Sequence, residues 1–164
     1  MFFNKRQVFI SLLIISVAMQ VIAAPLQIVT VSTDFASIAK YIGGKHVQVT
    51  SLINGSHDLH HINPKPSMVL KLRHADLLIR VGMSQDSWVD SLIQTARNPK
   101  VFKHSPGYLD ASINIPKLDV PTANVHKGHG DVHKDGNPHY WLSPKNGRLI
   151  AQAIANKLIK IATP

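Results

Sequence analysis

Seven of the ten histidines in this chain of 164 residues fall into two clusters. The first cluster is His57-Asp58-Leu59-His60-His61. The second comprises His126, His129, His133 and His139, with Asp131 and Asp135 beside them. Neutral imidazole is a common ligand for zinc, copper and nickel. A single loop histidine is most simply a surface residue, but the two clusters together predict a metal site. A metal site formed by His60 and His139 would take its ligands from two distant segments.

The composition excludes several other chemistries. The chain has no Cys, which excludes disulfides, thiolate ligands and a lipid-modified N-terminal cysteine. All nine acidic residues are Asp, so no Glu can serve as the base of a zinc hydrolase. The sequence also lacks a Gly-x-Ser-x-Gly turn and a phosphate-binding Gly-rich loop. These absences make an enzyme a poor fit to the residues, and an exported metallohydrolase in particular.

The formal net charge of +9 raises nucleic acid as a possible partner. However, the 18 Lys and Arg residues are scattered along the chain, and no recognition motif accompanies them. A solvated basic surface explains this pattern better, and we expect no nucleic-acid partner.

The first 23 residues have the pattern of a secretory signal peptide. Lys5 and Arg6 precede a mostly apolar run that ends in Val21-Ile22-Ala23. The small residues at this end predict cleavage after Ala23. The alternative is a retained membrane anchor, but the apolar run is short for a span of about 20 residues. We expect a periplasmic protein with no stable membrane insertion after cleavage.

The rest of the chain alternates strand and helix patterns. Strands are predicted at 26–32, 46–53, 75–82 and 100–103, and helices at 35–42, 67–73, 88–96 and 144–158. Such alternation predicts an α/β fold with a parallel sheet and helices on both faces. The segment 104–138 is rich in Pro and Gly and is expected to be irregular. It contains a His-rich loop at 121–138.

Two motifs resemble a known family. Residues 55–67, Gly-Ser-His-Asp-Leu-His-His-Ile-Asn-Pro-Lys-Pro-Ser, resemble the first signature of the periplasmic zinc- and manganese-type binding proteins of ABC importers. Residues 137–144, Asn-Pro-His-Tyr-Trp-Leu-Ser-Pro, resemble their second signature. The resemblance implies that His60 and His139 are metal ligands, whereas His57 and His61 are not at the ligand position. It also implies that His126, His129 and His133 belong to a loop that assists metal capture.

The same resemblance implies a domain organisation and a function. It implies two lobes joined by a long helix, with metal held between them. The expected parts are a signal peptide at 1–23, an N-terminal lobe at 24–143 and the start of the linking helix at 144–164. The family takes its remaining ligands from a C-terminal lobe, so the chain resembles a truncated receptor.

The implied function is extracytoplasmic binding of a divalent metal ion for delivery to the membrane permease of an ABC importer. Imidazole ligands favour zinc over manganese, which prefers more carboxylate. Two alternatives remain open. The chain could be a stand-alone periplasmic metal buffer or chaperone that uses its His loops, or a non-functional truncated receptor.

Overall fold

Four parallel strands form one sheet in the order β2-β1-β3-β4 in a computed structural model that describes residues 24–55, 58–122 and 133–163. The strands are β1 (Leu26–Thr30), β2 (Val47–Ser51), β3 (Leu77–Arg80) and β4 (Tyr108–Asp110). Ile28 of β1 pairs with Val49 of β2 on one side and with Leu77 of β3 on the other. The chain therefore leaves β1 toward one edge of the sheet and later returns to build the other edge.

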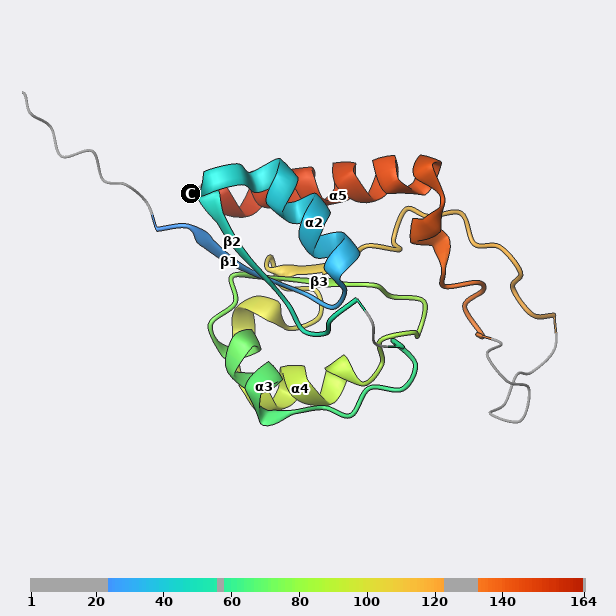
Figure 1. Ribbon diagram of the computed structural model, residues 1–164, viewed down its shortest axis with the longest axis horizontal. Coiled ribbons are helices and arrows are strands. Elements are labelled where there is room, and N and C mark those ends of the chain that lie inside the picture. Colours follow the sequence, from blue (N-terminus) through green and yellow to red (C-terminus); the bar gives the residue numbers. More distant parts are fainter. Residues whose placement is uncertain (1–23, 56–57, 123–132, 164) are drawn as a thin grey trace, which may run out of the picture.

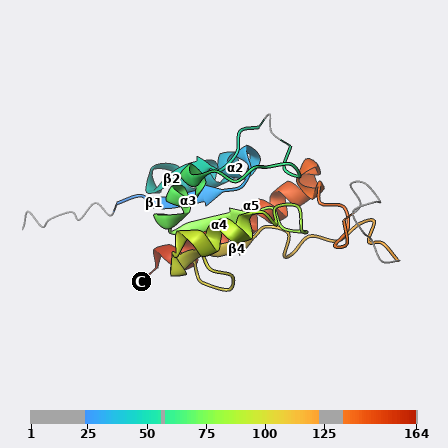
Figure 2. The same ribbon diagram turned by 90° about the horizontal axis from the view of Figure 1, so that it is seen from below.

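Helices cover both faces of this sheet. They are α2 (Thr33–Gly43), α3 (Pro66–Arg73), α4 (Val89–Ala96) and α5 (Pro144–Ala162). Helices α2 and α5 lie on one face, and α3 and α4 lie on the other (Figure 1). The view from below shows α3 on the side of β2 and α4 on the side of β4 (Figure 2). The predicted parallel sheet with helices on both faces is confirmed.

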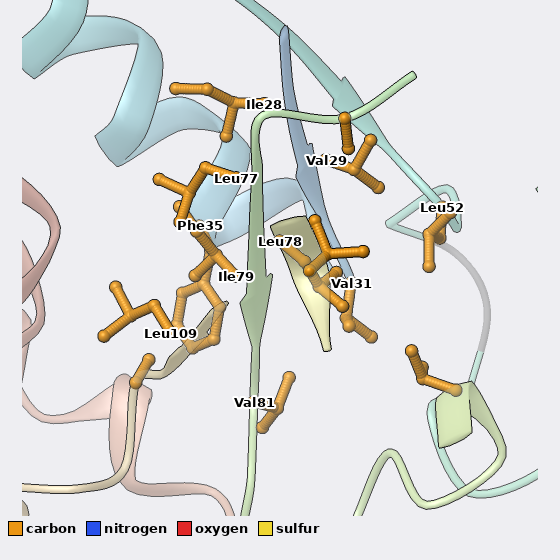
Figure 3. Close-up of a cluster of buried hydrophobic side chains, with 14 of the residues drawn as sticks. Ile28, Val29, Val31, Phe35, Leu52, Leu77, Leu78, Ile79, Val81 and Leu109 are labelled. Atoms are coloured by element: carbon orange, nitrogen blue, oxygen red, sulfur yellow. The ribbon is translucent and has the colours of Figure 1, made fainter. Parts of the chain in front are cut away.

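Buried side chains alternate between the two faces because successive residues of a strand point in opposite directions. Figure 3 shows Ile28, Leu77 and Ile79 on one side of the sheet with Phe35 of α2, and Val29 and Leu78 on the other. All four residues of β3 are buried, as the nearly continuous apolar pattern of a central parallel strand predicts. Each fully buried aliphatic side chain contributes roughly 1.5–3 kcal/mol to folding.

The prediction of a strand at 100–103 is wrong. Residues Pro99–Val101 form a short 3₁₀ helix, because the Asn98 side chain caps this turn by accepting a hydrogen bond from the backbone N–H of Lys100 at 3.1 Å. The fourth strand is instead β4, which lies within the segment expected to be irregular. Its three residues are too few to show a strand periodicity, and only pairing with β3 makes them a strand.

None of the helices in the described ranges combines the length and apolar character that crossing a bilayer requires. The predicted signal peptide, residues 1–23, lies outside the described residues.

Asp76 ties the amino ends of β1 and β3 together. Its carboxylate accepts a hydrogen bond from the backbone N–H of Gln27 at 3.0 Å and one from Lys100 Nζ at 2.7 Å. Partial burial raises the pKa of Asp76, but the bonds from Lys100 and Gln27 outweigh it, so the pKa lies below its ordinary value. The ionised carboxylate therefore stabilises the folded state above about pH 4.

Replacing Asp76 by asparagine should lower the free energy of unfolding at pH 7 by about 1 kcal/mol. The difference from the parent should shrink as the pH falls through the lowered pKa, because the parent carboxylate then becomes protonated. Urea unfolding at pH 7 and at pH 3 measures this change. Lys100→Met keeps the hydrogen bond from Gln27 to Asp76, so it should lower the free energy of unfolding less than Asp76→Asn does. If Asp76→Asn differs from the parent by the same amount at pH 7 and at pH 3, the stabilising role of the ionised Asp76 carboxylate is wrong.

Candidate metal-binding site

The candidate site lies at the carboxyl ends of β1 and β3. The connection after β1 leads to β2 at one edge of the sheet, and the connection after β3 leads to β4 at the other edge. Open α/β sheets bind ligands in the crevice where two such connections diverge. An open cavity of about 360 Å³ occurs here. Its lining includes Thr33, Asp34, Asp58, His60, Gln85 and His139. In Figure 1 the segment that precedes α5, drawn in orange, reaches the same end of the molecule as the carboxyl ends of the strands.

The loop after β2 places His60 at this cavity. Asp58 accepts a hydrogen bond from the backbone N–H of His60 at 2.9 Å. The Trp88 indole N–H donates to the carbonyl of Leu59 at 3.2 Å and fastens the loop to the start of α4. The His61 side chain contacts Asp58 at 2.9 Å. This contact and the N–H of His60 lower the pKa of Asp58, so a carboxylate charge that attracts cations lies at the rim.

A buried ion pair holds the loop after β3. The guanidinium of Arg80 contacts the carboxylate of Asp86 at 3.0 Å, and neither side chain is more than 8% exposed. The other carboxylate oxygen of Asp86 accepts the backbone N–H of Val81 at 2.8 Å. Burial raises the pKa of Asp86, while the charge of Arg80 opposes that rise. Burial works to lower the pKa of Arg80, but Asp86 overcomes it and raises that pKa above its ordinary value. The buried Arg80–Asp86 pair therefore fixes the loop that carries Gln85.

The segment before α5 is anchored through Tyr140 to the residue that follows β3. The buried Tyr140 hydroxyl donates to the carbonyl of Val81 at 2.6 Å. Burial raises the pKa of this hydroxyl far above its usual range, so it stays a neutral donor. Tyr140 begins the 3₁₀ turn Tyr140–Leu142, and His139 immediately precedes it.

Asn137 orients the His139 ring. Its Oδ1 accepts the backbone N–H of His139 at 3.0 Å and also lies 3.2 Å from His139 Nδ1. A backbone N–H can only donate, so the shared atom of Asn137 must be the oxygen. Nδ1 of His139 therefore carries the proton, and Nε2 keeps the lone pair that a metal ion needs.

The structure brings three of the predicted histidines together. The ring centroids of His60 and His139 are 5.7 Å apart, and those of His60 and His133 are 4.8 Å apart. Two imidazoles bound to one tetrahedral zinc ion have centroids roughly 5 Å apart. Among the described residues, no three His or Asp side chains already surround a single point. Further donors or small side-chain rotations are therefore needed for a complete coordination sphere.

The other predicted histidines lie elsewhere or cannot be placed. His61 lines a separate cavity with Ile62 and Lys65. His57, His126 and His129 lie outside the described residues.

Sequence reasoning missed three contributors to this site: Gln85, the Arg80–Asp86 pair and the orienting role of Asn137. One signal was available, because Arg80 is a charged residue inside the apolar run 77–81. A charge in a buried strand requires a buried partner. Nothing in the local pattern points to Gln85.

Comparison with known proteins places this arrangement in a family. The family model described as ZnuA, zinc-uptake complex component A, periplasmic, matches residues 28–164. The chain is 28% identical over 142 residues to the manganese ABC transporter substrate-binding lipoprotein scaA of Streptococcus gordonii, covering 84% of this chain and 42% of that protein. It is 25% identical over 145 residues to the iron-binding protein YfeA of Yersinia pestis, covering 84% and 40%. The chain thus spans less than half the length of these curated relatives.

Solved structures agree on the fold. The Zn(II)-bound AdcA of Streptococcus pneumoniae matches with a TM-score of 0.65 and 25% identity, covering 84% of this chain and 26% of that one. The Mn-bound periplasmic metal-binding protein of Candidatus Liberibacter asiaticus matches with a TM-score of 0.65 and 19% identity, covering 82% and 45%. With that family model matched over residues 28–164, the chain belongs to the ZnuA family.

Proposed function

We propose that this chain binds a divalent metal ion, zinc, outside the cytoplasm and takes part in its delivery to an ABC importer. The observation that carries the proposal is the 5.7 Å separation of the His60 and His139 rings. These residues come from two distant segments. One segment is held by Trp88 at the start of α4 and the other by the Tyr140 hydroxyl on the carbonyl of Val81. A pair of imidazoles fixed near ligand spacing suits the binding of a divalent metal ion.

Zinc is proposed over manganese because of the donor atoms. His60 and His139 offer nitrogen, which suits zinc, whereas carboxylates and carbonyls suit manganese. The family description names zinc uptake, while relatives are named for manganese and iron. His133, beside His60, is a candidate for a third nitrogen.

The domain organisation that the family resemblance implies is also proposed for this chain. Residues 1–23 would be a signal peptide, 24–143 an N-terminal lobe with a His-rich loop at 121–138, and 144–164 the start of a linking helix. Helix α5 spans most of the last part and packs against α2. Its buried residues Ile150, Ile154 and Leu158 support a linking helix that starts packed against the N-terminal lobe.

Removing either proposed ligand should weaken zinc binding at least tenfold, because each loss removes a metal–nitrogen bond. Isothermal titration of zinc into the parent, His60→Ala and His139→Ala measures this loss. His46→Ala is the matched control, because His46 is exposed and lies before β2, at the opposite end of the sheet. If both ligand variants bind zinc as tightly as the parent, the site is wrong.

The same titration separates the receptor lobe from a metal buffer. A metal buffer is a second candidate because the contact between His133 and His60 brings the two His-rich segments together. A receptor site binds one ion per chain with its affinity dependent on His60 and His139. A buffer takes up several ions per chain, and most of its capacity survives both substitutions.

A further inference from the structure

Gln85 is a buried polar residue whose side chain lies against His60. The residue is 5% exposed and lines the same cavity as His60 and His139. Its Nε2 lies 3.4 Å from Nε2 of His60. Its Oε1 is also buried, and no donor in the described part of the chain reaches it. A buried acceptor without a hydrogen bond lowers the stability of the fold, whereas an apolar side chain of similar size would not.

The backbone at Gln85 is held firmly. Its N–H donates to the carbonyl of Gly82 at 3.1 Å, and the next residue is Asp86, whose carboxylate is buried against Arg80. The preceding residues Met83 and Ser84 have φ angles of 48° and 61°. Two successive left-handed residues reverse the chain just after β3, and this reversal directs Gln85 into the cavity.

We propose that Gln85 supplies an amide oxygen to the metal ion bound at His60 and thereby sets the ion preference of the site. The proposal rests on the proposed metal-binding function. Rotation of the terminal amide by half a turn exchanges the positions of its oxygen and nitrogen, and such terminal torsions are broad and roughly two-fold. Without metal, the amide N–H faces His60 Nε2. With metal on that nitrogen, the rotated oxygen faces the ion.

An oxygen donor changes which ions the site prefers. Carbonyl oxygen suits manganese, while imidazole nitrogen suits zinc. A site built from two imidazoles and one amide oxygen therefore accepts manganese better than the same two imidazoles beside an apolar residue. Gln85 is in this sense a specificity-determining residue, and the ratio of zinc affinity to manganese affinity is the quantity that reports on it.

The test titrates zinc and manganese separately into the full chain and three variants. Gln85→Leu should weaken manganese binding by about tenfold and change zinc binding much less. Gln85→Glu, which keeps the shape and adds charge, should strengthen manganese binding above the parent. Gln152→Leu is the matched control, because Gln152 is exposed on α5, and it should leave both affinities unchanged.

Each outcome decides the question. Equal losses for both ions in Gln85→Leu would make Gln85 a structural residue only and overturn the proposal, as would unchanged affinities for both. If Gln85→Leu does not fold, Gln85→Glu decides alone, and an unchanged manganese affinity overturns it. In all these cases a loss of zinc binding in His60→Ala leaves the proposed function standing. Unchanged zinc binding in both His60→Ala and His139→Ala would remove that function, and with it the role of Gln85.

Discussion

Replacing Asp86 by alanine is expected to lower the free energy of unfolding by about 3–5 kcal/mol. The Asp86 side chain is completely buried and pairs with the buried guanidinium of Arg80. Its removal leaves that charge without its buried counter-ion and strips the backbone N–H groups of Val81 and Gly82 of their acceptor. Urea unfolding followed by circular dichroism measures the change.

Asp90→Ala provides the matched control for this prediction. Asp90 also pairs with Arg80, but its side chain is 66% exposed. Solvent already screens the Asp90 carboxylate, and Arg80 keeps its buried partner Asp86, so this variant should stay much closer to the parent than Asp86→Ala. If Asp86→Ala costs no more than Asp90→Ala, the buried pair does not hold the loop after β3. Replacing both Arg80 and Asp86 by apolar residues should recover much of the lost stability, since no unpaired charge then remains.

Phe35→Ala is expected to destabilise the chain by about 3–5 kcal/mol. Phe35 is fully buried on α2. Its ring centroid lies 6.4 Å from those of both Tyr140 and Trp141. Truncation leaves a cavity between the sheet and the turn that follows His139. Thermal and urea unfolding measure the loss.

Tyr41 on the same helix supplies the control for Phe35. It is 91% exposed, so Tyr41→Ala should change the free energy of unfolding by no more than about 0.5 kcal/mol. Zinc affinity should also fall in Phe35→Ala but not in Tyr41→Ala, because the Phe35 ring supports the turn next to His139. Equal effects of the two substitutions would show that Phe35 is not part of the core.

The site was only partly visible in the sequence. His60 and His139 stand in two motifs that resemble the signatures of a known family, and that resemblance allowed them to be proposed as ligands. Gln85 could not, because its importance lies in a 3.4 Å approach to His60. That approach arises only when the loops after β2 and β3 meet at the carboxyl end of the sheet. The role of Asn137 likewise depends on one oxygen that serves two donors of His139.

Local patterns determined the elements of this fold. The apolar run at 77–81 and the apolar spacing in the helices show which side chains avoid water. Neighbouring residues alone are enough to reveal this pattern and hence the strand or helix. Residues 99–110 show the limit. Val101 and Phe102 look like a strand locally, yet the Asn98 cap makes Pro99–Val101 a 3₁₀ helix, and Tyr108–Asp110 become the strand. Only the tertiary structure decided that exchange, because a short strand is stabilised by hydrogen bonds to its neighbour rather than by its own sequence. The tertiary structure also decided which histidines share a cavity, since distances between loops follow from the order of the strands.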